Sequence, residues 1–245
     1  MSKLKACPLS KRHEFFKIFG KEGKGECLHI DIFNEKMGKG DVHIKYDKRF
    51  DERVKELKRV YESNRFFLLV SGKRGSGKSV FAEIAKVRGL KGIEMSSIVF
   101  KRMVGQGYKI NNETTILFSK MIRRRYGSDI VARWTYSTIK EEDKVCISGI
   151  RSLDEMRFFK SKRPSLLIFI KAEESTRIKR IFSRKRKTDP NTITQFIERE
   201  KVENTELGFN KVEENADLYI TNNKDIGSFM EKSDKLIRFL LKDPF

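Results

Sequence analysis

From residue 66 onward, short apolar runs alternate with longer amphipathic stretches. Phe66–Val70 is apolar at every position, which is typical of a strand buried on both faces of a sheet. The segments expected to form strands are Phe66–Ser71, Gly92–Ser96, Lys144–Ser148, Ser165–Lys171 and Leu218–Thr221. The segments expected to form helices are Ser79–Val87, Ser97–Val104, Asn112–Tyr126, Ser128–Ile139, Ser152–Lys160, Ser175–Lys185, Thr192–Glu206 and Asp225–Leu241. This alternation predicts the α/β class, with a mostly parallel five-stranded sheet and helices on both faces.

The first 65 residues follow a different pattern. Residues 1–25 carry seven basic and two acidic side chains and are expected to form a basic arm. Glu26–Phe33 and Asp41–Tyr46 alternate polar and apolar positions, and the glycines between them favour a turn, so they predict a hairpin. Asp47–Ser63 has the apolar stripe of an amphipathic helix. We therefore expect a basic appendage, residues 1–65, and an α/β domain, residues 66–245.

The charge of the chain narrows the classes of partner. Among 245 residues, 54 Lys and Arg face 34 Asp and Glu, for a formal net charge of +20. Such an excess attracts polyanions, so nucleic acid is a possible partner alongside nucleotides and anionic lipid. Solubility or heat tolerance in a lysine-rich proteome explains the same excess equally well. The 38% of hydrophobic residues, 19 Phe among them, exclude a disordered polycation.

Several protein classes are disfavoured by what the sequence lacks. No apolar run approaches the roughly 20 residues that span a bilayer, and the first residues do not have the pattern of a signal peptide. The three cysteines are far apart and form no CxxC pair, which argues against a disulfide framework or a structural zinc site. We expect a cytoplasmic protein without a membrane partner, and no sequence feature indicates an oligomeric state.

The segment that carries chemistry lies between the first strand and the first helix of the α/β domain. It matches the pattern G-x-x-x-x-G-K-[ST] with Gly72, Lys73, Arg74, Gly75, Ser76, Gly77, Lys78 and Ser79. Glycines let the backbone wrap a phosphate with its N–H groups pointing inward, and the helix N-terminus behind them adds positive potential. Lys78 would reach the β- and γ-phosphates, and the Ser79 hydroxyl would ligate Mg²⁺. The eight residues therefore predict a site for ATP and Mg²⁺.

A single arginine follows the strand Lys144–Ser148. Arg151 is expected at the carboxyl end of a central strand, where ligands gather in open α/β sheets. Its guanidinium could hold a substrate phosphate with two hydrogen bonds. The alternative is a structural role, in which Arg151 pairs with Asp154 or Glu155 at the start of the next helix.

A strongly basic helix follows the fourth expected strand. Arg177–Lys187 contains seven bases and no acid, and Arg177, Arg180 and Arg184 share one helical face. Together with the turn Asp189-Pro190, this segment predicts a mobile lid near residues 177–190 that closes over a triphosphate. A solvated charged face and a nucleic-acid contact are the two other interpretations.

The motifs, taken in order, resemble a known group of enzymes. The chain from Phe66 to Leu241 resembles small P-loop kinases of the nucleoside-monophosphate kinase and dephospho-CoA kinase superfamily, and within it an archaeal group of uncharacterised kinase-like proteins. Besides the P-loop, the motifs that carry the resemblance are Met95-Ser96-Ser97, Ser148-Gly149-Ile150-Arg151-Ser152, Arg177–Pro190 and Ala216–Ile220. The resemblance implies a three-layer P-loop fold.

The resemblance also implies transfer of the γ-phosphoryl of ATP to a small nucleotide-like acceptor, of the nucleoside monophosphate or dephospho-CoA class. Lys78, Arg180 and Arg184 would balance charge on the phosphoryl group, and Arg151 would position the phosphorylated acceptor.

Two positions depart from the pattern of that group. Ser97 and Ser148 stand where the resembling kinases place acids, and serine brings no negative charge. The acids that could substitute are Glu94, Asp154 and Glu155. Two further hypotheses therefore stay open. One is an ATP-dependent RNA or DNA kinase or nucleic-acid-binding protein, favoured by the charge and by Arg123-Arg124-Arg125; the other is a non-catalytic nucleotide-binding relative.

Overall fold

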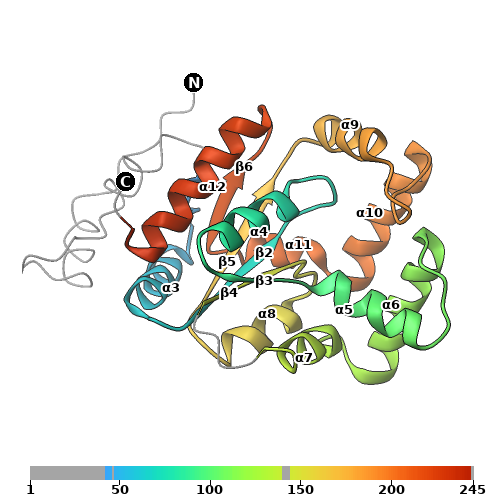
Figure 1. The fold of residues 1–245 in the computed structure, drawn as a ribbon, viewed down its shortest axis with the longest axis horizontal. Coiled ribbons are helices and arrows are strands. Elements are labelled where there is room, and N and C mark those ends of the chain that lie inside the picture. Colours follow the sequence, from blue (N-terminus) through green and yellow to red (C-terminus); the bar gives the residue numbers. More distant parts are fainter. Residues whose placement is uncertain (1–41, 46, 140–143, 244–245) are drawn as a thin grey trace, which may run out of the picture.

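A single six-stranded sheet forms the centre of the computed structural model, which describes residues 42–45, 47–139 and 144–243 (Figure 1). The strands are β1 (Val42–His43), β2 (Phe66–Ser71), β3 (Lys91–Glu94), β4 (Lys144–Ser148), β5 (Ser165–Lys171) and β6 (Leu218–Thr221). Their order is β1-β6-β5-β2-β4-β3, and every neighbouring pair is parallel except β1 with β6. The predicted sheet of five parallel strands is confirmed, with one short antiparallel strand added at its edge.

Ten helices of the described residues surround the sheet (Figure 1). They are α3 (Phe50–Glu62), α4 (Lys78–Val87), α5 (Met95–Gly105), α6 (Asn112–Tyr126), α7 (Ile130–Tyr136), α8 (Leu153–Lys160), α9 (Glu174–Arg184), α10 (Ile193–Leu207), α11 (Phe209–Glu214) and α12 (Ile226–Leu241). The sequence predicts all of them except α11, which Gly208 separates from α10 by adopting a left-handed conformation (φ +59°). None of these helices is long and apolar enough to cross a membrane.

The apolar strand β2 explains why helices cover both faces of the sheet, which gives the fold three layers. Phe66, Leu68 and Val70 point to a core shared with α3, α4 and α12. Phe67 and Leu69 point to the opposite face, where a second core is closed by α5, α6, α7, α8 and α11. Because successive side chains of a strand alternate between faces, a run without polar residues requires helices on both sides. The predicted fold class, an α/β fold of the P-loop type, is confirmed.

The first described residues pack against the sheet and its helices. The buried Arg53 of α3 donates from Nε to the carbonyl oxygen of Ala216 at 2.7 Å and pairs with Asp47 at 2.6 Å. His43 of β1 stacks on Tyr219 of β6 at 5.5 Å between ring centroids. The expected helix within Asp47–Ser63 is confirmed as α3. The basic arm, the strand Glu26–Phe33 and the turn after it lie outside the described residues, so the division at residue 65 stays a prediction.

The order of the strands locates the site. The chain runs from β2 to β3 on one side of β2, and after β4 it crosses to β5 on the other side. Open α/β sheets bind ligands at the carboxyl ends of the strands where the order reverses in this way. There the register is Val70 beside Ser148, and Ser148 beside Glu94. The expected strand Gly92–Ser96 ends two residues early, because α5 begins at Met95. Glu94 is therefore the last residue of β3 and lies at the same edge of the sheet as the glycine-rich loop.

Candidate active site

The loop between β2 and α4 is enclosed so closely that it requires glycine. Gly72 has φ +144°, and a Cβ there would come within 2.5 Å of the Ile170 carbonyl oxygen. Gly77 has φ +112°, and a Cβ there would come within 2.5 Å of Nδ2 of Asn222. The Asn222 amide also donates to the Ser76 carbonyl oxygen at 2.7 Å. The ends of β5 and β6 thus fix the loop in the open curve that receives phosphates.

Lys78 begins helix α4 and turns back toward the loop. Its ammonium donates to the carbonyl oxygens of Gly72 and Lys73, at 2.6 and 2.9 Å. Burial lowers the pKa of Lys78 to about 7, and the positive charge of Arg151 acts in the same direction. A phosphate chain would reverse this effect, because it brings negative charge to the ammonium.

The loop suits ATP and Mg²⁺ by its donors and its shape. Ser76 Oγ is buried and has no hydrogen-bond partner among the described residues, and Ser79 lies in the first turn of α4. The described residues contain no cluster of three or more His, Cys, Asp or Glu that could hold a metal. A P-loop magnesium ion does not need one, since Mg²⁺ keeps several waters and takes its other ligands from phosphates and one or two side chains. Ser79 is thus the side chain that would hold Mg²⁺.

A cavity of about 880 Å³ adjoins Lys78 on the side of β4 and β3. Its basic lining residues are Arg74, Lys78, Lys120, Arg123, Arg124, Arg151, Arg157, Arg199 and Lys211. Its acidic lining residues are Glu94, Asp154, Glu155, Glu203 and Glu206. The basic side chains outnumber the acidic ones, so the cavity favours an anionic ligand. The structure brings the predicted residues Lys78 and Arg151 together here.

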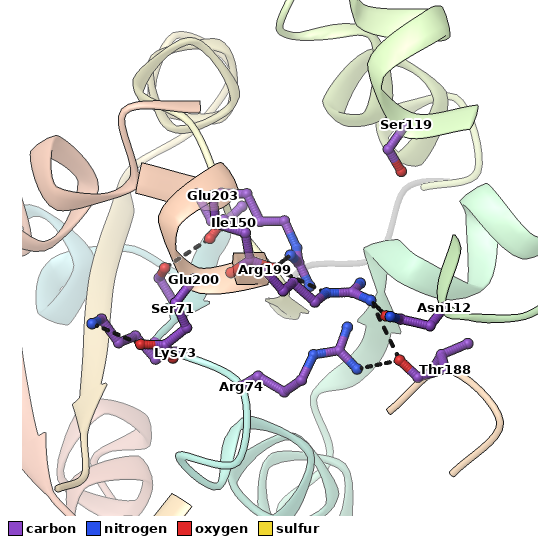
Figure 2. A network of polar contacts seen from close by, with 12 residues as sticks. Ser71, Lys73, Arg74, Asn112, Ser119, Ile150, Thr188, Arg199, Glu200 and Glu203 are labelled. Atoms are coloured by element: carbon purple, nitrogen blue, oxygen red, sulfur yellow. Dashed lines mark hydrogen bonds and ion pairs between the residues drawn. The ribbon is translucent and has the colours of Figure 1, made fainter. Parts of the chain in front are cut away.

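Arg151 and Arg199 share the carboxylate of Glu203. Figure 2 shows Arg199 in this network with Asn112 and Thr188. Burial would raise the pKa of Glu203, but the charges of Arg151 and Arg199 outweigh it and lower the pKa to about 2. Arg199 also donates to Oδ1 of Asn112 at the start of α6, so this network joins α10 to α6 across the cavity. Arg74 donates to the Thr188 carbonyl oxygen at 2.9 Å.

The alternative role predicted for Arg151, pairing with Asp154 or Glu155, is met by its backbone and not by its side chain. Glu155 accepts a hydrogen bond from the backbone N–H of Arg151 at 2.8 Å, while its other oxygen pairs with Arg123 at 2.8 Å. The Arg151 guanidinium pairs with Glu203, a contact between residues 52 positions apart for which the sequence offers no local signal. The Arg151 guanidinium is thus directed toward Glu203 in the cavity and not toward α8, the helix that follows it.

The three arginines of α9 each contact a different segment. Arg177 is buried and pairs with Glu200 of α10. Arg180 donates to the Asn222 carbonyl oxygen at 3.0 Å, and Arg184 pairs with the buried Asp189 at 2.8 Å.

Neither Arg180 nor Arg184 lines the cavity that Arg151 and Lys78 share. The turn at Asp189 is tied to the P-loop as well, since Arg74 pairs with Asp189 at 2.9 Å. Sequence reasoning missed Arg199, Glu200, Glu203 and the contacts of Asn222, and it gave Asp189 only as a turn residue. Single polar residues on helices and in turns give no signal of distant partners.

Known proteins share this sequence and fold. No family profile matches the chain. A UPF0200 protein of Hyperthermus butylicus is 32% identical over 179 residues, which cover 71% of this chain and 95% of that protein. The chain belongs to the UPF0200 family. This confirms the expected likeness to an archaeal group of kinase-like proteins.

Solved structures with little sequence identity show the same UPF0200 fold. The crystal structure of TT1252 from Thermus thermophilus aligns with a TM-score of 0.51 at 14% identity, over 71% of this chain and 96% of that one. Shikimate kinase from Acinetobacter baumannii aligns with a TM-score of 0.45 at 15% identity, over 76% and 97% of the two chains. The alignment with TT1252 shows that the UPF0200 chain and that protein share one fold.

Proposed function

We propose that this UPF0200 protein is an ATP-dependent phosphotransferase. It moves the γ-phosphoryl of ATP to a small nucleotide-like acceptor, of the nucleoside monophosphate or dephospho-CoA class. The observation that carries the proposal is the position of Lys78 and Arg151 in one basic cavity of about 880 Å³ beside the P-loop. A volume of this size accommodates a small phosphorylated molecule beside the end of a triphosphate.

Each part of the site has a task in this reaction. The backbone N–H groups of residues 72–77 and the Lys78 ammonium bind the β- and γ-phosphates. Ser79 is the residue that would hold Mg²⁺, which supplies neutralisation of the phosphate charge. Arg151 leaves Glu203 to bind the acceptor, and the charge of Glu203 keeps the guanidinium oriented until the acceptor enters.

Arg180 and Arg184, the arginines of the predicted lid, must move before they can take part in phosphoryl transfer. Arg184 pairs with Asp189 and Arg180 with the segment after β6, so both must exchange these partners for phosphate oxygens when the lid closes. Each arginine then replaces one polar partner with another, so closing the lid leaves no arginine without a contact. The arginines then balance the charge that spreads over the transferring group.

The test is transfer of labelled γ-phosphate from ATP in the presence of Mg²⁺. The acceptors are the nucleoside monophosphates, dephospho-CoA, transfer RNA and short single strands, with Lys78→Ala as the control. We expect label in a small molecule with the wild type and none with Lys78→Ala. Label in nucleic acid would replace the proposal with a nucleic-acid kinase, and ATP binding without transfer would indicate a non-catalytic relative.

A further inference from the structure

One acidic side chain of the cavity differs from the other four. Glu155 pairs with Arg123 at 2.8 Å, Glu206 with Lys120 at 2.6 Å, Asp154 with Arg157 at 3.6 Å and Glu203 with Arg151. Glu94 lines the same cavity and forms no ion pair with another described residue, although Glu203 and, less strongly, Glu94 raise the pKa of the Arg151 guanidinium by their charge. Its carboxylate accepts a hydrogen bond from the Ser96 hydroxyl at 2.8 Å. In a mainly basic cavity, Glu94 is thus the carboxylate left available for a ligand.

The position of Glu94 is set by the sheet. It is the last residue of β3 and lies beside Ser148, which in turn lies beside Val70, two residues before the P-loop. Two strand spacings place its backbone about 10 Å from the end of β2. The side chain is exposed to the cavity at the edge where a transferred phosphoryl group would meet its acceptor.

Ser97 and Ser148 stand where the resembling kinases place acids, but neither serine can supply the negative charge of a carboxylate. The Ser97 hydroxyl donates to the Glu94 carbonyl oxygen at 2.7 Å, and Ser97 does not line the cavity. Ser148 lines the cavity but is uncharged.

Glu155 is fully buried and held by Arg123, so proton transfer to it would break a buried ion pair. Asp154 also lines the cavity and is exposed, but it pairs with Arg157 at 3.6 Å and accepts a hydrogen bond from the Ser128 hydroxyl. Glu94 is the exposed carboxylate of the cavity that ends a strand of the sheet.

We propose that Glu94 is the catalytic base of this enzyme and that the acceptor atom is a hydroxyl oxygen, on a small molecule that also carries an anionic group. This inference rests on the proposed phosphotransferase function. The acceptor oxygen bonds to the γ-phosphorus, the bond from that phosphorus to the β,γ-bridging oxygen breaks, and ADP leaves with that electron pair. The hydroxyl proton passes to a Glu94 carboxylate oxygen.

The negative charge of Glu94 favours a hydroxyl over a phosphate as the group that accepts the phosphoryl. A phosphate acceptor is already ionised and needs no base, and an unpaired carboxylate beside it would repel it. A hydroxyl loses a proton during transfer and gains from a nearby base. The anionic group of the acceptor would bind Arg151, and Arg124 of α6 and Arg199 of α10 line the same cavity and add positive charge.

The test compares Glu94→Gln with the wild type in steady-state transfer, with the same acceptor panel. The matched control is Glu83→Gln on the far side of α4, an exposed acid paired with Lys86. We expect Glu94→Gln to lower kcat about 100-fold or more while the KM for ATP stays unchanged. Glu94→Asp, which keeps the carboxylate, should recover part of the rate, and thermal melting should give equal midpoints for all variants.

The chemical form of the product is the second readout. Label in an acid-stable phosphate ester supports the inference, and label in a diphosphate overturns it. A Glu94→Gln rate within threefold of the wild type overturns it, as does loss of Mg²⁺-dependent ATP binding, which would make Glu94 a metal ligand. ATP binding by the wild type without transfer to any acceptor overturns the phosphotransferase function, and the role of Glu94 with it.

Discussion

The P-loop and the neighbouring cavity form two halves of one site, but they are built in different ways. The P-loop is eight consecutive residues whose function depends on backbone shape, held by close contacts to β5, β6 and α9. The cavity takes its lining from residues between Arg74 and Lys211, and its function depends on how charged side chains pair. The P-loop should tolerate few substitutions, because each one disturbs the backbone shape. The cavity should lose function in steps, as its ion pairs are broken one at a time.

The two halves are also coupled through charge. Glu203 lies between Arg151 and Arg199, and it counters the positive charge that lowers the pKa of Lys78. Arg74 links the P-loop to the turn at Asp189. In the proposed reaction, an acceptor that binds Arg151 would therefore change the electrostatic surroundings of Lys78. The following experiments separate the contributions of the two halves.

Lys78→Ala should have the largest effect. The ammonium is the charged side chain that the P-loop places against the phosphates, so we expect transfer to fall at least about 100-fold. Labelled-phosphate transfer measures the rate, and Lys86→Ala, at an exposed position of the same helix, is the control. Transfer at a near wild-type rate in Lys78→Ala would show that the P-loop is not the nucleotide site.

Gly77→Ala tests the requirement for backbone shape. The left-handed conformation and the approach of the new Cβ to Asn222 should destabilise the fold by about 1–3 kcal/mol and abolish ATP binding. Gly105→Ala is the matched control, because Gly105 lies at the end of α5 with no atom near its added Cβ. Chemical denaturation and calorimetric ATP titration check the two effects. Equal stability of both variants would contradict the close contacts described for the loop.

Glu203→Gln tests the cavity half. Removing this charge leaves Arg151 and the buried Arg199 uncompensated in a partly buried network, so we expect a loss of about 2 kcal/mol in the free energy of unfolding, less than for a fully buried pair. Glu206→Gln breaks an exposed pair with Lys120, and its loss should stay below about 1 kcal/mol.

The pH dependence gives a second check on Glu203. Its pKa is lowered from 4.5 to about 2 in the folded protein, so its stabilising effect is complete above pH 4.5 and lost as pH falls toward 2. Stability of the wild type should therefore fall more steeply with acid than stability of Glu203→Gln. Parallel denaturation curves across this range would contradict the pairing with Arg151 and Arg199.

The smallest expected effect is a proton taken up when ATP binds. Lys78 has a pKa of about 7 in the free protein, so much of it is neutral at pH 8, and the phosphates favour its charged form. Titration calorimetry in buffers of different ionisation enthalpy should show uptake of a fraction of a proton at pH 8. Lys78→Arg, which stays charged, should show less, and equal uptake would assign the proton to another group.

Particular elements show how far the sequence predicts the structure. The strands β2, β4, β5 and β6 and the helix α6 have the predicted bounds, because their apolar pattern ends at polar residues or glycine. β3 ends two residues before its predicted end, since no breaker residue separates it from α5. The six-residue helix α11 is too short to show a helical period, although Phe209 and Val212 are buried.

The P-loop could be predicted because all its determinants are neighbours in the chain. Glycines, lysine and serine at fixed spacing set the local backbone, and the flanking strand and helix are equally local signals. The sequence by itself thus determined the α/β fold, the glycine-rich loop between β2 and α4, and the place of Arg151 at the same edge of the sheet.

Only the tertiary structure decided how the charges pair. Arg151 meets Glu203, Arg184 turns to Asp189, and Glu94 accepts a hydrogen bond from Ser96 without an ion pair among the described residues, although sequence spacing treats all of these acids alike. Ion pairs between distant segments depend on which helices the packed core brings together. That packing follows from burial of apolar faces over the whole domain, which no local pattern of charges contains.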